Sequence, residues 1–331
     1  MATRARGVVA VTGATGFLGR HLVRALAQDG WTPRVLVRRD PIHPLWSDIE
    51  VEIVTGDLRT PGALERLSSG AETVIHGAGL IKARSLEAFH GVNRDGAQAA
   101  AAAAKAAGAR FILVSSLAAR EPGLSHYAAS KRAGEEAVRA TDPSALIVRP
   151  PAIYGPGDTE TLALFRLAAR SPVLPVLSPK SRIAMIHVHD AAAKLVAFCR
   201  SPTLGVVELS DVRRDGYSWT EIMSGAARVM GANPRLVRLP DQGVLAAGAL
   251  ADAWSSLTKT PSVFGWGKAR ELLHADWTLS SAPMSEGVPS MFGLIDGFAH
   301  TVDWYRAAGW LPKNIAAEFK YGGNLTDSSL Q

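Results

Sequence analysis

Several patterns that mark common protein classes are missing from this sequence of 331 residues. Its single cysteine, Cys199, excludes a disulfide framework within the chain and any cysteine cluster for zinc or iron–sulfur, so we expect a reducing, cytoplasmic setting. Charges of one sign form no long block, because 36 basic and 30 acidic residues are scattered and leave a net charge of +6. We therefore expect no nucleic-acid partner, and the positive balance favours small anions.

Long apolar runs are missing too. The most apolar later stretch, residues 244–253, is too short and too rich in alanine and glycine to span a bilayer. The first residues include two arginines but lack the apolar stretch and the small-residue cleavage site of a signal peptide. The GxSxG, HExxH and P-loop strings are absent as well. We expect no membrane insertion and none of the chemistries that those strings mark.

A regular alternation runs through residues 8–149. Short β-branched segments alternate with longer helical patterns, as in parallel strands joined by crossover helices. The expected strands are residues 8–12, 34–37, 51–54, 73–76, 111–114 and 145–148. We predict an α/β fold, in which residues 1–150 form a Rossmann-type doubly wound parallel sheet.

The rhythm loosens after residue 150, and no flexible linker marks a boundary. Residues 151–331 are expected to form a smaller, mainly helical C-terminal lobe that interleaves with the first part. Its expected helices are residues 191–200, 218–230, 241–257, 268–274 and 294–308. Five large rings are assigned by default to the core of this lobe: Trp254, Trp266, Trp277, Trp304 and Trp310.

A glycine-rich turn follows the first expected strand and opens a helix. Missing side chains let the backbone approach a pyrophosphate there, and the helix N-terminus offers unpaired N–H groups; a simple glycine turn is the alternative. The spacing is GxxGxxG rather than GxGxxG. The candidate dinucleotide-binding residues of the turn are Gly13, Thr15, Gly16, Phe17, Leu18 and Gly19.

The end of the second expected strand indicates which dinucleotide binds. A carboxylate at this place would bind the ribose 2′-hydroxyl of NAD, but the strand ends in Arg38 and Arg39. Two guanidiniums suit a 2′-phosphate, so NADP(H) is favoured over NAD(H). The alternative is a pair of solvated surface arginines.

Tyr127 and Lys131 stand four residues apart, on one face of an expected helix. An ammonium beside a phenol stabilises the phenolate, which makes the tyrosine a usable proton donor or acceptor. The preceding strand ends in Ser115 and Ser116, where a hydroxyl can hold a substrate carbonyl beside the phenol.

With these residues in view, the sequence resembles the extended short-chain dehydrogenase/reductase superfamily. That group includes NAD(P)-dependent epimerases and dehydratases, reductases like 3β-hydroxysteroid dehydrogenase, and a branch related to an accessory subunit of respiratory complex I. The matching strings, in family order up to about residue 200, are TGATGFLG (12–19), GDL (56–58), HGAG (76–79), VNRDG (92–96), VSS (114–116), YAASK (127–131), RPPAIYGPGD (149–158) and HVHD (187–190).

The resemblance implies a role for each matched position. Ser116 would orient the substrate, Tyr127 would be the general acid/base, and Lys131 would bind the nicotinamide ribose and lower the pKa of the tyrosine. Asn93 would hold the neighbouring helix and a relay water, with a helix cap as its alternative. The further cofactor contacts that the resemblance implies are Asp57 and Leu58 at the adenine, Gly77, Ala78 and Gly79 on the inner side, and Pro150 and Ile153 in the segment that passes over the nicotinamide with Tyr154 and Gly155. A homodimer through residues 97–107 and 125–140 is implied too.

Two departures bear on the substrate. Tyr127 follows Ser116 by only eleven residues, and Ala152 stands where sugar-nucleotide epimerases commonly carry an asparagine. We predict an NADP-dependent oxidoreductase that reduces a ketone or aldehyde, or oxidises the alcohol, of a small hydrophobic substrate in a cleft between residues 151–185 and 240–280. The alternatives are a nucleotide-sugar epimerase or dehydratase and a non-catalytic NADPH-binding assembly or sensor protein.

The HVHD string offers two histidines, His187 and His189, to a metal ion. Both would point the same way from a strand, but no third ligand cluster accompanies them in the sequence. We expect no metal site and interpret the string as a strand end followed by Asp190, the cap of a helix over residues 191–200.

Overall fold

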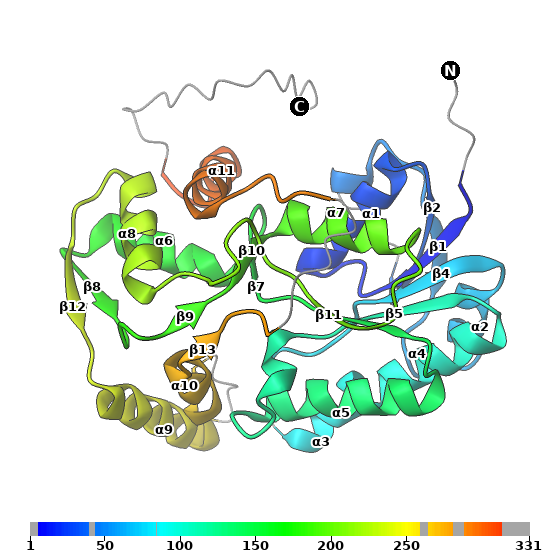
Figure 1. The fold of residues 1–331 in the computed structure, drawn as a ribbon, viewed down its shortest axis with the longest axis horizontal. Helices are drawn as coiled ribbons and strands as arrows, with labels where there is room; N and C mark the ends of the chain where they lie inside the picture. Colours follow the sequence, from blue (N-terminus) through cyan, green and yellow to red (C-terminus); the bar gives the residue numbers. More distant parts are fainter. Residues whose placement is uncertain (1–5, 40–43, 84, 259–263, 281–287, 313–331) are drawn as a thin grey trace.

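A parallel sheet of seven strands forms the centre of the computed structural model, in the order β11-β6-β5-β4-β1-β2-β3 (Figure 1). The structure describes residues 6–39, 44–83, 85–258, 264–280 and 288–312. The strands are β1 (Val8–Thr12), β2 (Thr32–Val37), β3 (Glu52–Thr55), β4 (Ala71–His76), β5 (Arg110–Val114), β6 (Leu146–Arg149) and β11 (Gly205–Glu208). Every expected strand is present within two residues of its predicted bounds, and the predicted Rossmann-type fold is confirmed.

The central strands are apolar because helices cover both faces of the sheet. One buried layer includes α1 (Phe17–Gln28) and α7 (Val188–Phe198). The layer on the other face includes α2 (Ala63–Ser68), α4 (Asp95–Ala106) and α5 (His126–Thr141). The short helix α3 (Leu86–Asn93) packs against α4 and α5.

The chain after residue 150 contributes to both parts of the molecule. We expected the helix near residues 191–200 to belong to the smaller lobe, but this was wrong: Leu195 and Phe198 of α7 share a buried cluster with Val9 and Leu22. The apolar residues of α7 cover the part of the sheet beside α1, which would otherwise meet water. Strand β11, which no pattern predicted, extends the sheet by pairing with β6. The division of the chain at residue 150 stays a prediction.

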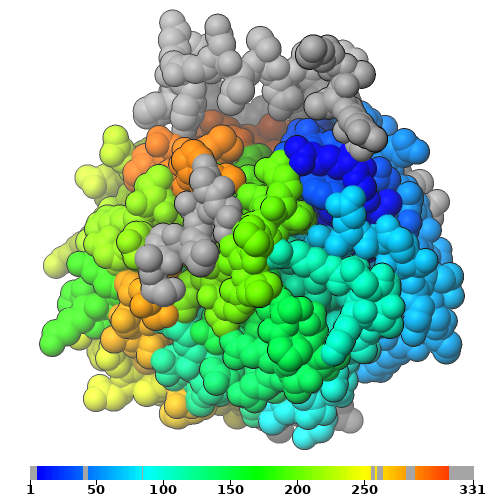
Figure 2. Space-filling view, turned by 45° about the vertical axis from the view of Figure 1, so that its right-hand side comes forward, coloured from blue at the N-terminus to red at the C-terminus, as the bar shows by residue number. Residues whose placement is uncertain are grey.

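The smaller lobe gathers helices around three two-stranded parallel sheets. The paired strands are β7 (Ala152–Tyr154) with β10 (Met185–His187), β8 (Val173–Val176) with β12 (Arg235–Arg238), and β9 (Arg182–Ile183) with β13 (Asp276–Trp277). The helices are α6 (Glu160–Arg170), α8 (Trp219–Met230), α9 (Asp241–Thr258), α10 (Trp266–Leu273) and α11 (Leu294–Ala307). In Figure 2 the blue N-terminal segments lie mainly on the right of the view and the yellow and orange segments of the lobe mainly on the left, with green segments between them.

The tryptophans of this lobe divide into two groups. Trp277, Trp304 and Trp310 pack against its buried cluster, as expected. Trp254 and Trp266 are instead 69% and 45% exposed, so their assignment to the core was wrong. No helix within the described residues combines the length and the apolar character that crossing a membrane requires.

Candidate active site and cofactor site

The predicted site residues come from the segments that follow successive strands of the sheet. All the strands run parallel, so their carboxyl ends meet at one edge. The chain reverses its winding direction between β1 and β4, and ligands of open α/β sheets bind beside such a switch point. The glycine turn follows β1, Arg38 follows β2, Asp57 follows β3 and Ser116 follows β5, so the fold brings them to the same edge.

The glycine turn after β1 fits a dinucleotide pyrophosphate. Gly13 has a φ of +72°, and a Cβ there would lie 2.6 Å from the backbone nitrogen of Ala78. Gly16 is exposed and precedes α1, whose N-terminus has no side-chain cap and no acidic residue in its first turn. The first N–H groups of α1 therefore remain available to phosphate oxygens, at the positive end of the helix dipole.

Close packing also explains the last glycine of the turn. A Cβ on Gly19 would lie 2.1 Å from the carbonyl oxygen of Gly13, so only glycine lets α1 start at this place. Thr15 is exposed, whereas Phe17 and Leu18 are half-buried. The turn thus has the open backbone that a cofactor of the NAD(P) type requires.

Two arginines stand at the end of β2 and an aspartate follows β3, and the side chains differ in how they are held. Arg38 and Arg39 are exposed, and neither forms an ion pair within the described part of the chain. Asp57 is held in a turn, since its Oδ1 accepts hydrogen bonds from the Arg59 nitrogen (2.9 Å) and the Thr60 hydroxyl (3.0 Å). These bonds lower the pKa of Asp57. The carboxylate therefore shapes the turn, and its contact with an adenine stays a prediction.

Tyr127 and Lys131 lie one turn apart on α5. Ser125 begins this helix, because its hydroxyl accepts a hydrogen bond from the Ala128 nitrogen (3.0 Å). The Lys131 Nζ is buried and donates a hydrogen bond to the Val114 carbonyl oxygen (2.8 Å), which leaves two of its three hydrogens for other partners. This bond fixes the ammonium group at the carboxyl end of β5.

Burial shifts the pKa values of both groups. The pKa of Tyr127 is raised by burial, the nearby Ser116 hydroxyl acts in the opposite direction, and the charge of Glu271 raises it further. Burial lowers the pKa of Lys131 to about 8, against a smaller upward effect of Glu135. At neutral pH the phenol is therefore protonated and the lysine is charged, as a proton donor and its supporting cation require.

The two serines after β5 have different partners. The Ser115 hydroxyl donates a hydrogen bond to Glu135 Oε1 (2.6 Å), and Glu135 also accepts hydrogen bonds from the Arg149 guanidinium at 2.8 and 2.6 Å. Ser115 thus belongs to a buried ion-pair network. Ser116 accepts a hydrogen bond from the Ala118 nitrogen (3.2 Å) at the start of the 3₁₀ helix Leu117–Arg120 and is the serine beside the phenol of Tyr127.

Asn93 joins three segments around Lys131. Its Nδ2 donates hydrogen bonds to the Leu80 carbonyl oxygen (3.0 Å) and to the Ser130 hydroxyl (2.9 Å), and its Oδ1 accepts one from the Leu80 nitrogen (2.8 Å). A Cβ on Gly79 would lie 3.1 Å from Asn93 Oδ1 and 3.8 Å from Lys131 Nζ. The missing side chain of Gly79 thus leaves a space beside the ammonium group. Gly77 and Ala78 belong to the same segment, directly after β4.

Pro150 and Ile153 connect the sheet to the smaller lobe. Pro150 is buried, and its carbonyl oxygen accepts a hydrogen bond from the Leu117 nitrogen (2.9 Å), next to Ser116. Ile153 lies in β7 and is half-buried. Their contact with a cofactor stays a prediction.

Sequence reasoning missed Glu271, a nearly buried carboxylate on α10. The Ser125 hydroxyl donates a hydrogen bond to Glu271, so a residue of the smaller lobe reaches the N-terminus of the helix that carries Tyr127. Close packing supports this contact, since a Cβ on Gly267 would lie 2.9 Å from the Ser125 Cβ. The two partners are 146 positions apart in the sequence, and no local pattern indicates such a pair.

The HVHD string has a different role from the one we expected. Helix α7 begins at Val188, and His187 caps it by accepting a hydrogen bond from the His189 nitrogen at its Nδ1 (3.2 Å). The carboxylate of Asp190, which we expected to be the cap, accepts hydrogen bonds from the Met291 and Phe292 nitrogens (2.9 and 3.1 Å). That assignment was wrong because the helix starts three residues earlier.

A third histidine, His300 of α11, joins His187 and His189, and the nearest ring nitrogens of the three lie within 4.8 Å of one another. The sequence did not indicate this neighbour. Because His187 Nδ1 accepts the capping bond, its Nε2 must carry the hydrogen, which it donates to His300 Nδ1 (3.2 Å). A nitrogen that carries hydrogen cannot bind a metal ion, so this tautomer does not fit a three-histidine site.

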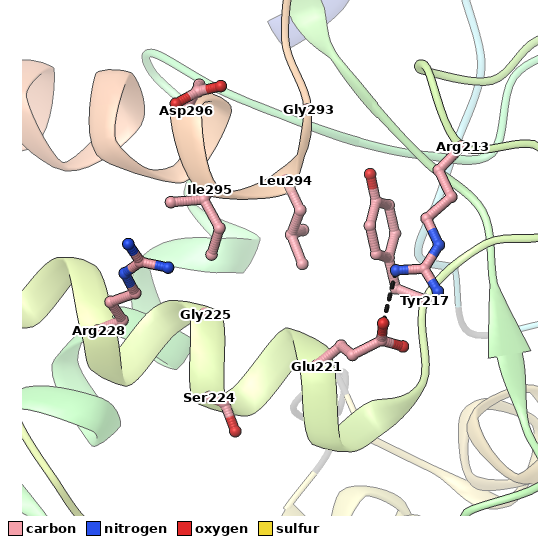
Figure 3. Close-up of a pocket in the computed structure, with 10 residues that line it drawn as sticks. All are labelled: Arg213, Tyr217, Glu221, Ser224, Gly225, Arg228, Gly293, Leu294, Ile295 and Asp296. Atoms are coloured by element: carbon pink, nitrogen blue, oxygen red, sulfur yellow. Dashed lines mark hydrogen bonds and ion pairs between the residues drawn. The ribbon is translucent and has the colours of Figure 1, made fainter. Parts of the chain in front are cut away.

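A separate pocket of about 460 Å³ lies between α8 and the start of α11. Figure 3 shows Arg213 paired with Glu221 at its edge, with the guanidinium 5.0 Å from the ring centre of Tyr217. Its walls come from residues 213–228 and 293–296, so none of the predicted catalytic residues lines it.

The fold, the glycine turn and the Tyr127–Lys131 pair define an NAD(P)-dependent oxidoreductase, a class that the comparisons support. The chain belongs to the NAD dependent epimerase/dehydratase family, whose model matches residues 9–208. It is 83% identical to the ceramide reductase of Caulobacter vibrioides (strain NA1000 / CB15N) over 317 residues, which cover 96% of this chain and 100% of that protein.

More distant relatives agree with the resemblance drawn from the motifs. The chain is 28% identical to a mitochondrial NADH dehydrogenase (ubiquinone) 1 alpha subcomplex subunit 9 of Dictyostelium discoideum, over 67% of this chain and 64% of that protein. The crystal structure of gox2253 superposes with a TM-score of 0.73 at 22% identity, covering 91% of this chain and 98% of that one, which supports the fold alone. The predicted family and the predicted oxidoreductase activity are thus confirmed.

Proposed function

We propose that the protein is an NADPH-dependent reductase of a ketone on a ceramide-type lipid, an N-acylated long-chain amino alcohol. The observation that carries the proposal is the 83% identity to a ceramide reductase, over the whole length of that protein. The similarity extends over 96% of this chain, so it includes both the sheet and the smaller lobe.

The chemistry of a ceramide-type lipid indicates which of its groups accepts the hydride. A ceramide carries hydroxyl groups and one amide, and an amide carbonyl is a poor hydride acceptor because nitrogen donates electrons to it. The acceptor carbonyl is therefore a ketone at a position that becomes a hydroxyl of the ceramide. This agrees with the hydrophobic carbonyl substrate predicted from the sequence.

Three side chains have separate roles in the proposed mechanism. The cofactor, when bound, supplies the hydride that becomes attached to the ketone carbon. The Ser116 hydroxyl donates a hydrogen bond to the ketone oxygen and sets its direction, and Tyr127 gives its phenolic proton to the same oxygen. Lys131 stabilises the phenolate that forms, because its ammonium is one helical turn away and is fixed by the Val114 carbonyl.

NADPH is the proposed cofactor because Arg38 and Arg39 are exposed at the carboxyl end of β2, beside the glycine turn that follows β1. Charge-assisted hydrogen bonds from two free guanidiniums would favour a 2′-phosphate. The contacts of Asp57, Asn93 and the other cofactor residues belong to the same proposal, while the homodimer and the cytoplasmic location stay predictions.

The test is a reduction assay with purified protein, NADPH and a ceramide analogue that carries a ketone and short acyl chains. We expect consumption of NADPH and a product heavier by two hydrogens, detected by mass spectrometry. A panel of uridine and thymidine diphosphate sugars serves as the competing substrate class. Turnover of a nucleotide sugar with none of the ceramide ketone would reject the proposal in favour of an epimerase or dehydratase.

A further inference from the structure

Helix α9 turns an apolar face to the solvent. Leu250 and Trp254, one helical turn apart, are 71% and 69% exposed. Their exposed neighbours between residues 246 and 254 are alanines, apart from Asp252, whose carboxylate accepts a hydrogen bond from the Trp266 nitrogen (2.7 Å). A surface helix of a soluble protein normally presents polar residues on this side. The outer face of α9 is therefore apolar where water-facing residues are expected to be polar.

Two basic residues precede this helix in the chain. Strand β12 leads directly into α9, and its Arg235 and Arg238 are exposed, together with Val237 and Leu239. Neither arginine forms an ion pair in the part of the chain that the structure describes. We call the residues Arg235, Arg238, Leu239, Leu250 and Trp254 the α9 surface.

We propose that the α9 surface docks on a lipid bilayer that contains anionic headgroups. Tryptophan and leucine on an interfacial helix enter the boundary between headgroups and acyl chains, and flanking arginines pair with lipid phosphates. The helix would lie in the plane of the interface. The choice of a bilayer rather than a protein rests in part on the proposed function, because a ceramide-type substrate resides in membranes.

The same helix pair connects this surface to the active site. The inner side of α9 packs closely on α10, since a Cβ on Gly248 would lie 2.9 Å from the Ala269 Cβ. In turn, α10 contacts the segment before Tyr127: Arg270 donates a hydrogen bond to the Gly123 carbonyl oxygen (2.7 Å), and Glu271 accepts one from Ser125. Figure 1 shows α9 and α10 side by side at the lower edge of the smaller lobe. Docking would therefore bring the helix pair that contacts the segment before Tyr127 to the membrane.

The test is flotation of the full chain with vesicles of phosphatidylcholine and phosphatidylglycerol, compared with vesicles of phosphatidylcholine alone. The variant Leu250→Ser/Trp254→Ser removes the two apolar side chains, and we expect its partition into the anionic vesicles to fall by about tenfold or more. Arg238→Ser should lower the partition by about fivefold, and only for anionic vesicles. Leu204→Ser is the matched control, because Leu204 is 59% exposed on a different part of the molecule.

Each outcome decides the proposal. Binding by the wild type that is lost in the double variant and kept in Leu204→Ser supports it, provided that circular dichroism shows the variants to be folded. No binding by the wild type, or equal binding by the double variant, overturns it. The other possible occupant of the α9 surface is a second copy of this chain, which sedimentation analysis of the same proteins tests. If the wild type is a dimer, the double variant is a monomer and vesicle binding is unchanged, the surface belongs to a second copy and the proposal is overturned.

Turnover of the soluble short-chain ketone separates this inference from the proposed function. The double variant should reduce that ketone as fast as the wild type and should lose activity only on a long-chain ketone embedded in vesicles. Vesicle binding without turnover of either ketone would reject the proposed function and leave the docking surface standing. Turnover without vesicle binding would reject the docking surface alone.

Discussion

Replacement of Tyr127 by phenylalanine separates the chemical role of the phenol from its structural role. The variant keeps the ring, which packs 6.2 Å from the ring of Phe89, and removes only the hydroxyl. General acid catalysis contributes about 10²- to 10⁴-fold to a rate, so kcat should fall by at least this range. The corresponding loss of transition-state stabilisation is about 2.7–5.5 kcal/mol.

The structural cost of the same change should be smaller. The hydroxyl has one neutral partner nearby, Ser116, and a hydrogen bond of this kind contributes about 0.5–1.5 kcal/mol to stability. Cofactor binding should survive, since Lys131 keeps its bond to the Val114 carbonyl without the phenol. The two effects therefore differ enough to be told apart.

The assay measures NADPH oxidation with the short-chain ceramide ketone, NADPH binding by fluorescence titration, and the midpoint of thermal unfolding. We expect a collapse of kcat with a nearly unchanged Kd for NADPH. Turnover within about threefold of the wild type would reject Tyr127 as the proton donor. A fall in kcat that matches a fall in the folded fraction would assign the residue to structure.

Three further changes test the surroundings of this tyrosine. Arg38→Ala/Arg39→Ala should raise the Kd for NADPH about tenfold or more and leave that for NADH unchanged, by titration with both cofactors; an unchanged preference would remove the arginines from the cofactor site. Because burial lowers the pKa of Lys131 to about 8, its ammonium is lost as the pH rises through that value, so the rate of reduction should decline above about pH 8. In Lys131→Arg, whose guanidinium stays charged, a persisting decline would show that another group titrates. Glu135→Gln should lower the free energy of unfolding by about 3–5 kcal/mol in urea, because it breaks a buried ion pair, whereas the exposed Glu136→Gln should change it by about 0–1 kcal/mol.

Local patterns were sufficient for six of the seven strands of the sheet, and they indicated the glycine turn and the Tyr127–Lys131 pair as candidate site features. Strands of a parallel sheet are buried on both faces, so runs such as residues 111–114 stand out in the sequence. The glycine turn needs its small residues for reasons that lie within a few positions, and Tyr127 and Lys131 meet on one helix. Each of these features depends on neighbours in the sequence, which a pattern can show.

The features that were missed depend on distant neighbours. Strand β11 has four residues and is recognised as part of the sheet only by its pairing with β6. His300 reaches His187 across 113 positions, and nothing near either residue indicates the partner. Trp254 was assigned to the core on its ring alone, although the side of α9 that packs against α10 decides which residues are buried.

The contact between Ser125 and Glu271 explains how the smaller lobe can influence chemistry that the sheet positions. Ser125 has two roles at once, since its hydroxyl accepts the capping bond from Ala128 and donates to Glu271. A movement of α10 would therefore disturb the first turn of α5, which contains Tyr127, and would also withdraw a negative charge that raises the pKa of the phenol. Because α10 is also the inner partner of α9, the helix pair is joined to the start of α5 by the contacts of Glu271 with Ser125 and of Arg270 with Gly123. The smaller lobe thus contacts the helix that carries Tyr127, even though every proposed catalytic residue belongs to the first part of the chain.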